Sequence, residues 1–196
     1  MNTDVMFSSK RADWETPPEL FMKYHRQYNY TIDVCANETN HKLPNWMGPF
    51  RYAVTGERGF TDGLAHTWTE RCWCNPPYQD PEAACKPNCK KKKCQERGHH
   101  VTEYQPGTID WVKKAYDSVF VQGTAELVTL LLPARTDTKW YHTYIWDDEI
   151  GWFRPGVIVD FLPGRVKFLV DGQTKDPAPF PSMVVTMLEP DEDVIL

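Results

Sequence analysis

The most informative stretch of the sequence is residues 71–78, Arg-Cys-Trp-Cys-Asn-Pro-Pro-Tyr. Residues 71–74 predict a short strand, and the two prolines must end it, because proline fixes φ and cannot donate to a sheet ladder. Asn75 and Tyr78 therefore stand just beyond the carboxyl end of a strand. In open α/β sheets, ligands bind at this edge.

Helices are predicted on both sides of this stretch. A helix of about three turns should run to near Tyr28, with Thr16 as its cap, Pro17 at its first position and Glu19 completing a capping box. Apolar residues at helical spacing predict a second helix from Thr108. A third is expected further on, with Thr136 as a candidate cap.

The remaining pattern predicts short strands. They are residues 30–34, 126–132, 150–154, 157–161, 166–170 and 182–188, whereas 37–62 should be irregular with at most one short helix. Strands that alternate with helices early and follow one another later favour an α/β fold. We expect a three-layer sandwich around a mostly parallel sheet, in which the late strands can add an antiparallel pair at one edge.

Length and composition narrow the class of protein. At 196 residues, with 41% hydrophobic and 13% aromatic side chains, the chain is expected to form a single domain over residues 1–196. No run of about 18 apolar residues predicts a membrane span. Residues 1–13 lack the apolar core of a signal peptide, so we expect a cytoplasmic protein with reduced thiols. The net charge of −5 does not favour nucleic-acid binding, although clustered basic residues matter more.

Residues 75–78, the Asn-Pro-Pro-Tyr tetrapeptide at the strand end, can serve a specific chemical function. The Asn75 side-chain oxygen and the Pro76 carbonyl can both accept hydrogen bonds from one exocyclic amine, which localises the lone pair of a poorly nucleophilic nitrogen. Pro77 keeps the turn rigid, and Tyr78 offers a flat face on which an extruded base can stack. The plainer interpretation is a rigid strand-to-loop turn. The preceding strand and the upstream acids Asp33 and Asp62 favour the catalytic interpretation.

The chain resembles the small, phage-type DNA N6-adenine methyltransferases over nearly its whole length. The matching stretches are residues 14–17, 32–37, 62–64, Trp68, 75–78, 132–136 with Trp140, and 164–168. The resemblance implies a Rossmann-like methyltransferase fold, S-adenosylmethionine as methyl donor, and the N6 amine of a flipped adenine in double-stranded DNA as acceptor. For a phage-encoded enzyme it also implies the host cytoplasm, and no obligate protein partner is evident.

The same resemblance implies the cofactor contacts. The candidates are Trp14, Thr16, Asp33, Cys35, Asn37 and Asp62. Asp33 would face the methionine ammonium group, and Asp62 would accept from the cofactor adenine. For each acid the simpler role is that of a turn-forming residue. The usual glycine of the first motif is missing, and Asn37 stands near the expected turn, where asparagine tolerates left-handed backbone.

Residues 81–106 form an insert with few aliphatic side chains. Cys85, Cys89 and Cys94, followed by His99 and His100, match a Cys3His structural zinc site, with His100 preferred as the fourth ligand. A metal would supply the ordering energy that burial cannot. The competing interpretation is a disordered, lysine-rich loop with free thiols.

DNA contacts are expected from basic and hydroxyl side chains near the same sheet edge. Residues 86–97 hold six basic residues against one acid, a composition that can bind phosphates or form an ordinary solvated face. The candidates are Lys90, Lys91, Lys92, Arg135, Thr136, Thr138 and Arg165.

Two alternative functions stay open. The tetrapeptide chemistry also serves methyltransferases that act on RNA or on protein glutamine. A zinc-stabilised nucleic-acid-binding protein without catalysis is the second alternative, and cofactor binding without turnover would support it.

Overall fold

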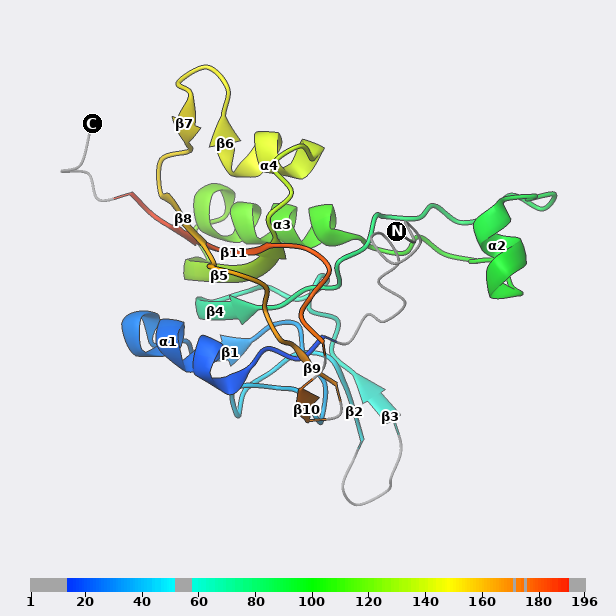
Figure 1. The fold of residues 1–196 in the computed structure, drawn as a ribbon, viewed down its shortest axis with the longest axis horizontal. Helices are drawn as coiled ribbons and strands as arrows, with labels where there is room; N and C mark the ends of the chain where they lie inside the picture. The colour runs from blue at the N-terminus through cyan, green and yellow to red at the C-terminus, as the bar shows by residue number, and fades with distance from the viewer. Residues whose placement is uncertain (1–13, 52–57, 171, 175, 191–196) are drawn as a thin grey trace.

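A computed structural model describes residues 14–51, 58–170, 172–174 and 176–190. A five-stranded sheet with the order β1-β4-β5-β11-β8 lies at its centre (Figure 1). The strands are β1 (Ile32–Asp33), β4 (Glu70–Cys74), β5 (Ala125–Pro133), β8 (Val157–Phe161) and β11 (Ser182–Leu188). β1, β4 and β5 pair in parallel, and β11 runs antiparallel to both β5 and β8.

The sheet is therefore mixed. The expectation of a mostly parallel sheet holds for strand direction, because only β11 is reversed, but two of the four pairings are antiparallel. The reversed strand is inserted between β5 and β8 rather than placed at the edge. The chain reaches this position through long connections, because a helix and two small hairpins lie between β5, β8 and β11.

Helices cover both faces of the sheet. α1 (Pro18–Tyr28) lies on one side, and α3 (Thr108–Tyr116) with α4 (Lys139–Tyr144) lies on the other (Figure 1). α3 continues directly into a π-helical turn, η2 (Asp117–Val121).

Successive side chains along the central strands pack alternately into two hydrophobic clusters, one on each face of the sheet. In β4, Cys72 and Cys74 pack into the cluster with α3 and α4, whereas Trp73 packs into the cluster with α1. In β5, Leu130 and Leu131 divide between the clusters in the same way. Because both faces of these strands are buried, they read as continuous apolar runs. The core thereby holds the carboxyl end of β4 in place.

The helix starts differ from the predicted caps. The residue before α1 is Pro17, and no side chain caps the helix, so the capping box of Thr16 and Glu19 is wrong. The residue before α4 is Thr138 rather than Thr136, and its hydroxyl donates to the Arg135 carbonyl at 2.8 Å. Neither helix therefore begins with the cap that the sequence predicts.

Small hairpins complete the described chain. They are β2 (Pro49–Arg51) with β3 (Arg58–Phe60), β6 (Trp146–Asp147) with β7 (Trp152–Phe153), and β9 (Leu169–Val170) with β10 (Gln173–Thr174). The expectation for residues 37–62 is wrong in part: its described residues form no helix, as expected, but include the two short strands β2 and β3. The strands predicted at 150–154 and 166–170 are shorter than expected. No helix among the described residues is long and apolar enough to cross a membrane.

Candidate active site

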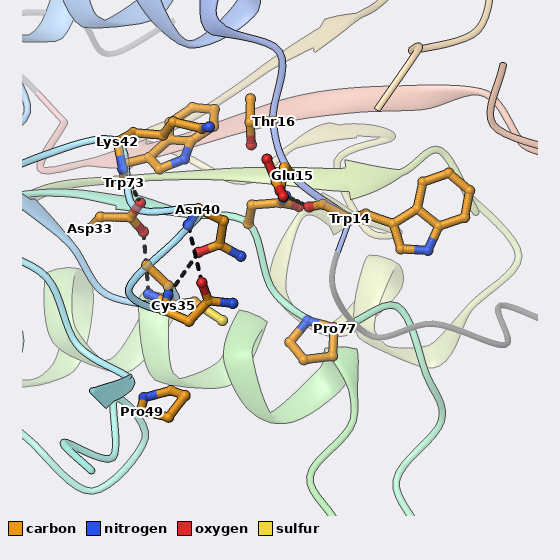
Figure 2. Close-up of a pocket in the computed structure, with 13 residues that line it drawn as sticks. Trp14, Glu15, Thr16, Asp33, Cys35, Asn40, Lys42, Pro49, Trp73 and Pro77 are labelled. Carbon is orange, nitrogen blue, oxygen red and sulfur yellow. Dashed lines mark hydrogen bonds between the residues drawn. The ribbon is translucent and has the colours of Figure 1, made fainter. Parts of the chain in front are cut away.

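A cavity of about 310 Å³ opens at the carboxyl ends of β1 and β4 (Figure 2). It is lined by Trp14, Glu15, Thr16, Asp33, Cys35, Ala36, Asn37, Asn40, Lys42, Pro49, Trp73, Asn75 and Pro77. Its volume is at the lower end of the range for small-molecule sites. Five of the six predicted cofactor residues and two residues of the tetrapeptide meet here.

Asp33 ends β1 at the floor of this cavity and is 3% exposed. Its two carboxylate oxygens accept hydrogen bonds from the backbone N–H groups of Cys35 (3.4 Å) and Lys42 (3.0 Å). Burial raises the pKa of Asp33 to about 6, and these hydrogen bonds oppose the rise. A buried carboxylate of this kind is suited to a cationic ligand.

The loop after β1 replaces the missing glycine with side-chain hydrogen bonds. Asn37 Oδ1 accepts from the backbone N–H groups of Thr39 (2.8 Å) and Asn40 (3.0 Å), and Asn40 Oδ1 accepts from Asn37 N–H at 2.7 Å. Among the described non-glycine residues, only Asn29 and Glu70 have positive φ. The turn at Asn37 is therefore built without the left-handed backbone expected there.

The N-terminal segment closes one side of the cavity. Glu15 forms a two-way backbone bridge with Leu169 of β9, with both N···O distances at 3.0 Å. Thr16 is 2% exposed and faces the cavity instead of capping α1. Asn75 Nδ2 donates to the Trp14 carbonyl at 2.6 Å, which ties this segment to the tetrapeptide.

The amide of Asn75 is held in one orientation. Its nitrogen faces a carbonyl that can only accept, so its oxygen faces the Tyr78 hydroxyl, 2.6 Å away. An amide oxygen has two lone pairs, so one acceptor position on Oδ1 remains for a ligand. Within the described part of the chain, no group donates a hydrogen bond to the Pro76 carbonyl oxygen. Two acceptors thus stand at the end of β4.

Tyr78 is packed among aromatic rings. Its ring meets Phe168 and Phe180 edge-on, with centroids 6.0 and 5.5 Å apart, and burial raises its pKa. Its hydroxyl also lies 3.0 Å from the Leu131 carbonyl. Tyr78 fixes Asn75 in this structure, whereas its predicted stacking on a base stays a prediction.

Asp62 lies outside the cavity described above. It lines a second hollow of about 420 Å³ with Tyr104, Asp110 and Lys113. Its carboxylate accepts from the Leu64 N–H at 2.9 Å, as in an ordinary aspartate turn. Asp62 and Asp33 therefore line different hollows, although Gly63, the next residue, lies against the Val34 carbonyl beside Asp33. The predicted contact of Asp62 with the cofactor stays a prediction.

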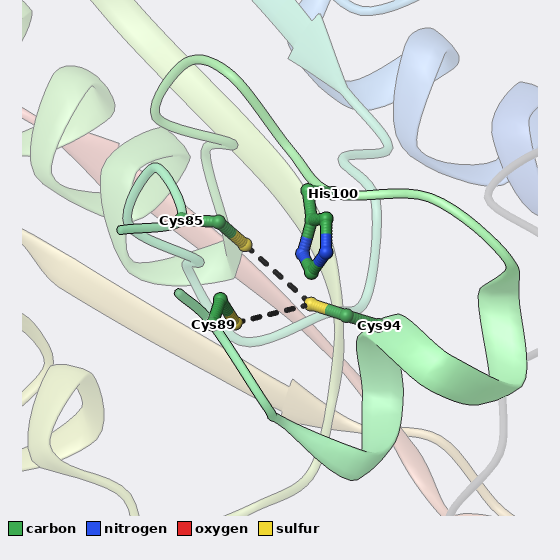
Figure 3. A group of neighbouring side chains, drawn as sticks. All are labelled: Cys85, Cys89, Cys94 and His100. Carbon is green, nitrogen blue, oxygen red and sulfur yellow. Dashed lines mark hydrogen bonds between the residues drawn. The ribbon is translucent and has the colours of Figure 1, made fainter. Parts of the chain in front are cut away.

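The cysteine-rich insert gathers three thiols and one imidazole (Figure 3). The ligand atoms of Cys85, Cys89, Cys94 and His100 all lie within 4.8 Å of one another, and Sγ of Cys94 is 3.4 and 3.7 Å from the other two sulfurs. With Zn–S bonds of about 2.3 Å, tetrahedral geometry places sulfurs about 3.8 Å apart. His100, and not His99, belongs to the cluster.

Part of the insert's positive charge is already neutralised. The buried carboxylate of Glu82 pairs with Lys93 at 3.0 Å and Arg97 at 3.1 Å, and these contacts lower the pKa of Glu82 to about 2. The helix α2 (Lys92–Arg97) carries both cations. Lys90 and Lys91 are exposed and make no ion pair among the described residues.

The other predicted DNA contacts are dispersed. Arg135 and Thr136 are exposed after β5, and the Thr136 carbonyl accepts a hydrogen bond from His142 Nε2 at 2.8 Å. Arg165 lines a separate groove beside α1, and its guanidinium donates to the Ala178 carbonyl at 3.3 Å.

Sequence reasoning missed several side chains of the site. Glu15, Asn40 and Lys42 line the cavity, and Phe180 packs against both Trp14 and Tyr78. Asn40 and Lys42 stand in the segment expected to be irregular, and no spacing marks them. Glu15 lies within a matching stretch, which was the one available signal.

Known proteins with similar sequences identify the family of this chain. A curated relative, the DNA N-6-adenine-methyltransferase of Haemophilus phage HP1 (strain HP1c1), is 31% identical over 80 residues, which cover 38% of this chain and 40% of that protein. The match thus spans less than half the length of that relative. No solved structure matches the chain. The model of the DNA N-6-adenine-methyltransferase (Dam) family matches residues 4–192, so the family resemblance is confirmed and the chain belongs to this family.

Proposed function

We propose that this protein transfers a methyl group from S-adenosylmethionine to the N6 amine of adenine in double-stranded DNA. The observation that carries the proposal is the position of Asn75 beside the cavity, with its amide oriented and an acceptor position open. Family membership supports the same reaction. We also propose that residues 1–196 act as one three-layer, Rossmann-like domain in the cytoplasm.

The cavity at the ends of β1 and β4 fits the methionine part of the cofactor. Asp33 and Glu15 supply buried carboxylates for an ammonium group, and Trp14, Thr16, Cys35 and Asn37 complete the wall. The bound cofactor supplies an electrophilic methyl group on a sulfonium. Asp62 keeps its proposed contact with the cofactor adenine only if that ring reaches the second hollow.

The chain's own residues act on the target amine. The Asn75 side-chain oxygen and the Pro76 carbonyl accept its two hydrogens, which draws the nitrogen lone pair out of conjugation with the ring. Tyr78 holds the Asn75 oxygen in place, and Pro77 fixes the turn. Preorganised acceptors of this kind lower a barrier because they need no reorientation during the reaction.

Zinc is the metal that fits the insert. Three sulfur ligands and one imidazole form the usual donor set of a closed structural site, and the sulfur separations agree with tetrahedral coordination. Cys85, Cys89, Cys94 and His100 would hold the ion, whose role is to order the loop.

The proposed phosphate contacts of the insert are its exposed lysines, Lys90, Lys91 and Lys92. Lys92 also forms an ion pair with Glu96, with an N···O distance of 3.6 Å. Arg135, Thr136, Thr138 and Arg165 are proposed contacts on the remaining DNA surface. Replacing the three lysines by glutamine should weaken binding to all duplex sequences and flatten the dependence of affinity on salt. An unchanged salt dependence would count against this surface.

The reaction is tested by transfer of labelled methyl groups to unmethylated duplex DNA. Wild type should produce N6-methyladenine, and Asn75→Ala should lower kcat by at least about a hundredfold, the usual loss for one preorganised polar group. Asn45→Ala, which changes an exposed asparagine outside the cavity, is the matched control. Label on RNA or protein glutamine instead, or cofactor binding without any transfer, would overturn the DNA assignment.

A further inference from the structure

Lys42 is a cavity residue to which neither the motifs nor the comparisons give a role. Its backbone N–H donates to Asp33 Oδ2 at 3.0 Å, so the base of the side chain is fixed beside the floor of the cavity. Lys42 is half-buried and lines the cavity together with Asp33 and Glu15 (Figure 2).

The ammonium group of Lys42 has no hydrogen bond and no ion pair within 4 Å among the described residues. Lys42 is half-buried, and partial desolvation of an ammonium group is unfavourable unless an opposite charge or a hydrogen bond compensates it. Burial lowers the pKa of Lys42, and the charges of Glu15 and Asp33 act against this effect. An anion from outside the chain would satisfy the group.

The charged side chains around the cavity are complementary to a ligand that carries both positive and negative groups. Among the residues that the structure describes, Glu15, Asp33 and Lys42 are the only Asp, Glu, Lys or Arg side chains that line it, which gives two acids against one base. The methionine part of S-adenosylmethionine carries two cationic centres, an ammonium and a sulfonium, and one carboxylate. The two acids and one base of the cavity therefore match, in number and in sign, the two cationic centres and one carboxylate of this ligand.

We propose that Lys42 binds the carboxylate of the cofactor's methionine moiety, while Asp33 and Glu15 face its cationic centres. This assignment rests on the proposed function, since it takes S-adenosylmethionine as the ligand. It makes Lys42 a specificity determinant, because a ligand without the carboxylate leaves the ammonium unpaired.

The test compares two ligands on four proteins. Dissociation constants for S-adenosylmethionine and for decarboxylated S-adenosylmethionine are measured by calorimetry with wild type, Lys42→Met, Lys42→Arg and Lys139→Met. Lys42→Met removes the charge but keeps the aliphatic stem, whereas Lys42→Arg retains a cation. Lys139→Met removes an exposed lysine at the start of α4, away from the cavity. Melting temperatures show whether each variant is folded.

Lys42→Met should bind S-adenosylmethionine about ten- to a hundredfold more weakly than wild type, the usual effect of losing a charge-assisted hydrogen bond. Its affinity for the decarboxylated ligand should change less than about threefold. Lys42→Arg should restore most of the difference, and Lys139→Met should behave as wild type. If Lys42→Met weakened the binding of both ligands equally, the proposed role of Lys42 would be overturned, but the proposed function would not. A wild-type protein that binds neither ligand would overturn the proposed function as well.

Discussion

The proposed cofactor cavity and the cysteine-rich insert are separated by only a few residues in the chain, yet each is held together in a different way. The cavity lies at the ends of β1 and β4, in which Ile32 and residues 72–74 are buried in the two hydrophobic clusters. In the insert, Cys94 and Glu82 are buried, among side chains that are mostly exposed. Burial therefore orders the first region, whereas we propose that the second depends on a bound metal and on the ion pairs of Glu82.

The two regions meet at the base of the insert. Glu82 and Gln105 form a two-way backbone bridge, and the Thr108 hydroxyl donates to the Pro77 carbonyl at 3.0 Å. Gly107 lies against this turn, where an added Cβ would stand 2.3 Å from Pro81 N, so only glycine fits. We therefore expect these contacts to keep the sheet intact when the insert loses its order.

The largest expected effect separates the two regions directly. Removing zinc with a chelator, or Cys94→Ser, should make the insert at least about tenfold more sensitive to trypsin, because structural zinc contributes on the order of 10 kcal/mol to ordering its ligands. The urea midpoint of the sheet domain should move little. Equal protection of the insert with and without metal would contradict this picture.

The second effect belongs to the cavity region. Trp73 is fully buried and lines the cavity, so Trp73→Ala should lower the free energy of unfolding by about 3–5 kcal/mol. Trp152, which is 61% exposed, provides the control, and Trp152→Ala should cost less than about 1 kcal/mol. Urea denaturation followed by circular dichroism measures both. Similar losses in the two variants would show that the cavity wall is not part of the core.

A third effect follows from the buried acid. Because the folded-state pKa of Asp33 is about 6 instead of 3.8, the folded protein binds this proton more tightly than the unfolded chain does. The contribution of Asp33 to stability therefore declines as pH rises from about 4 to about 6, by about 3 kcal/mol at most. Asp33→Asn should remove this decline in unfolding curves measured across the window. A wild-type profile that matches the variant's would contradict the raised pKa.

The smallest effect tests the junction. Thr108→Val removes the hydroxyl contacts with the Pro77 and Gln79 carbonyls, at 3.0 and 3.3 Å, and should lower kcat about tenfold with little change in cofactor affinity. Thr108→Ser keeps the hydroxyl and should retain most of the activity. If both variants lose activity equally, packing of the methyl group rather than the hydrogen bonds positions the tetrapeptide.

Local pattern was enough to predict many elements. Val157–Phe161 and Ser182–Leu188 form strands at the bounds expected from their apolar residues, and α1 runs to Tyr28 as predicted. The cap at Thr16 failed because that side chain turns into the cavity, where tertiary contacts outweigh a local preference. The position of β11 between β5 and β8 also depends on long-range pairing.

The sequence by itself determined the two chemical signatures, the Asn-Pro-Pro-Tyr turn after a strand and the Cys3His spacing, since each depends on residues close together in the chain. Only the tertiary structure decided which distant side chains join them. It places Trp14 beside Asn75, His100 instead of His99 beside the three cysteines, Asp62 and Asp33 in different hollows, and Lys42 in the cavity. The physical reason is that packing of the sheet and its loops sets these neighbours, and no local spacing encodes such packing.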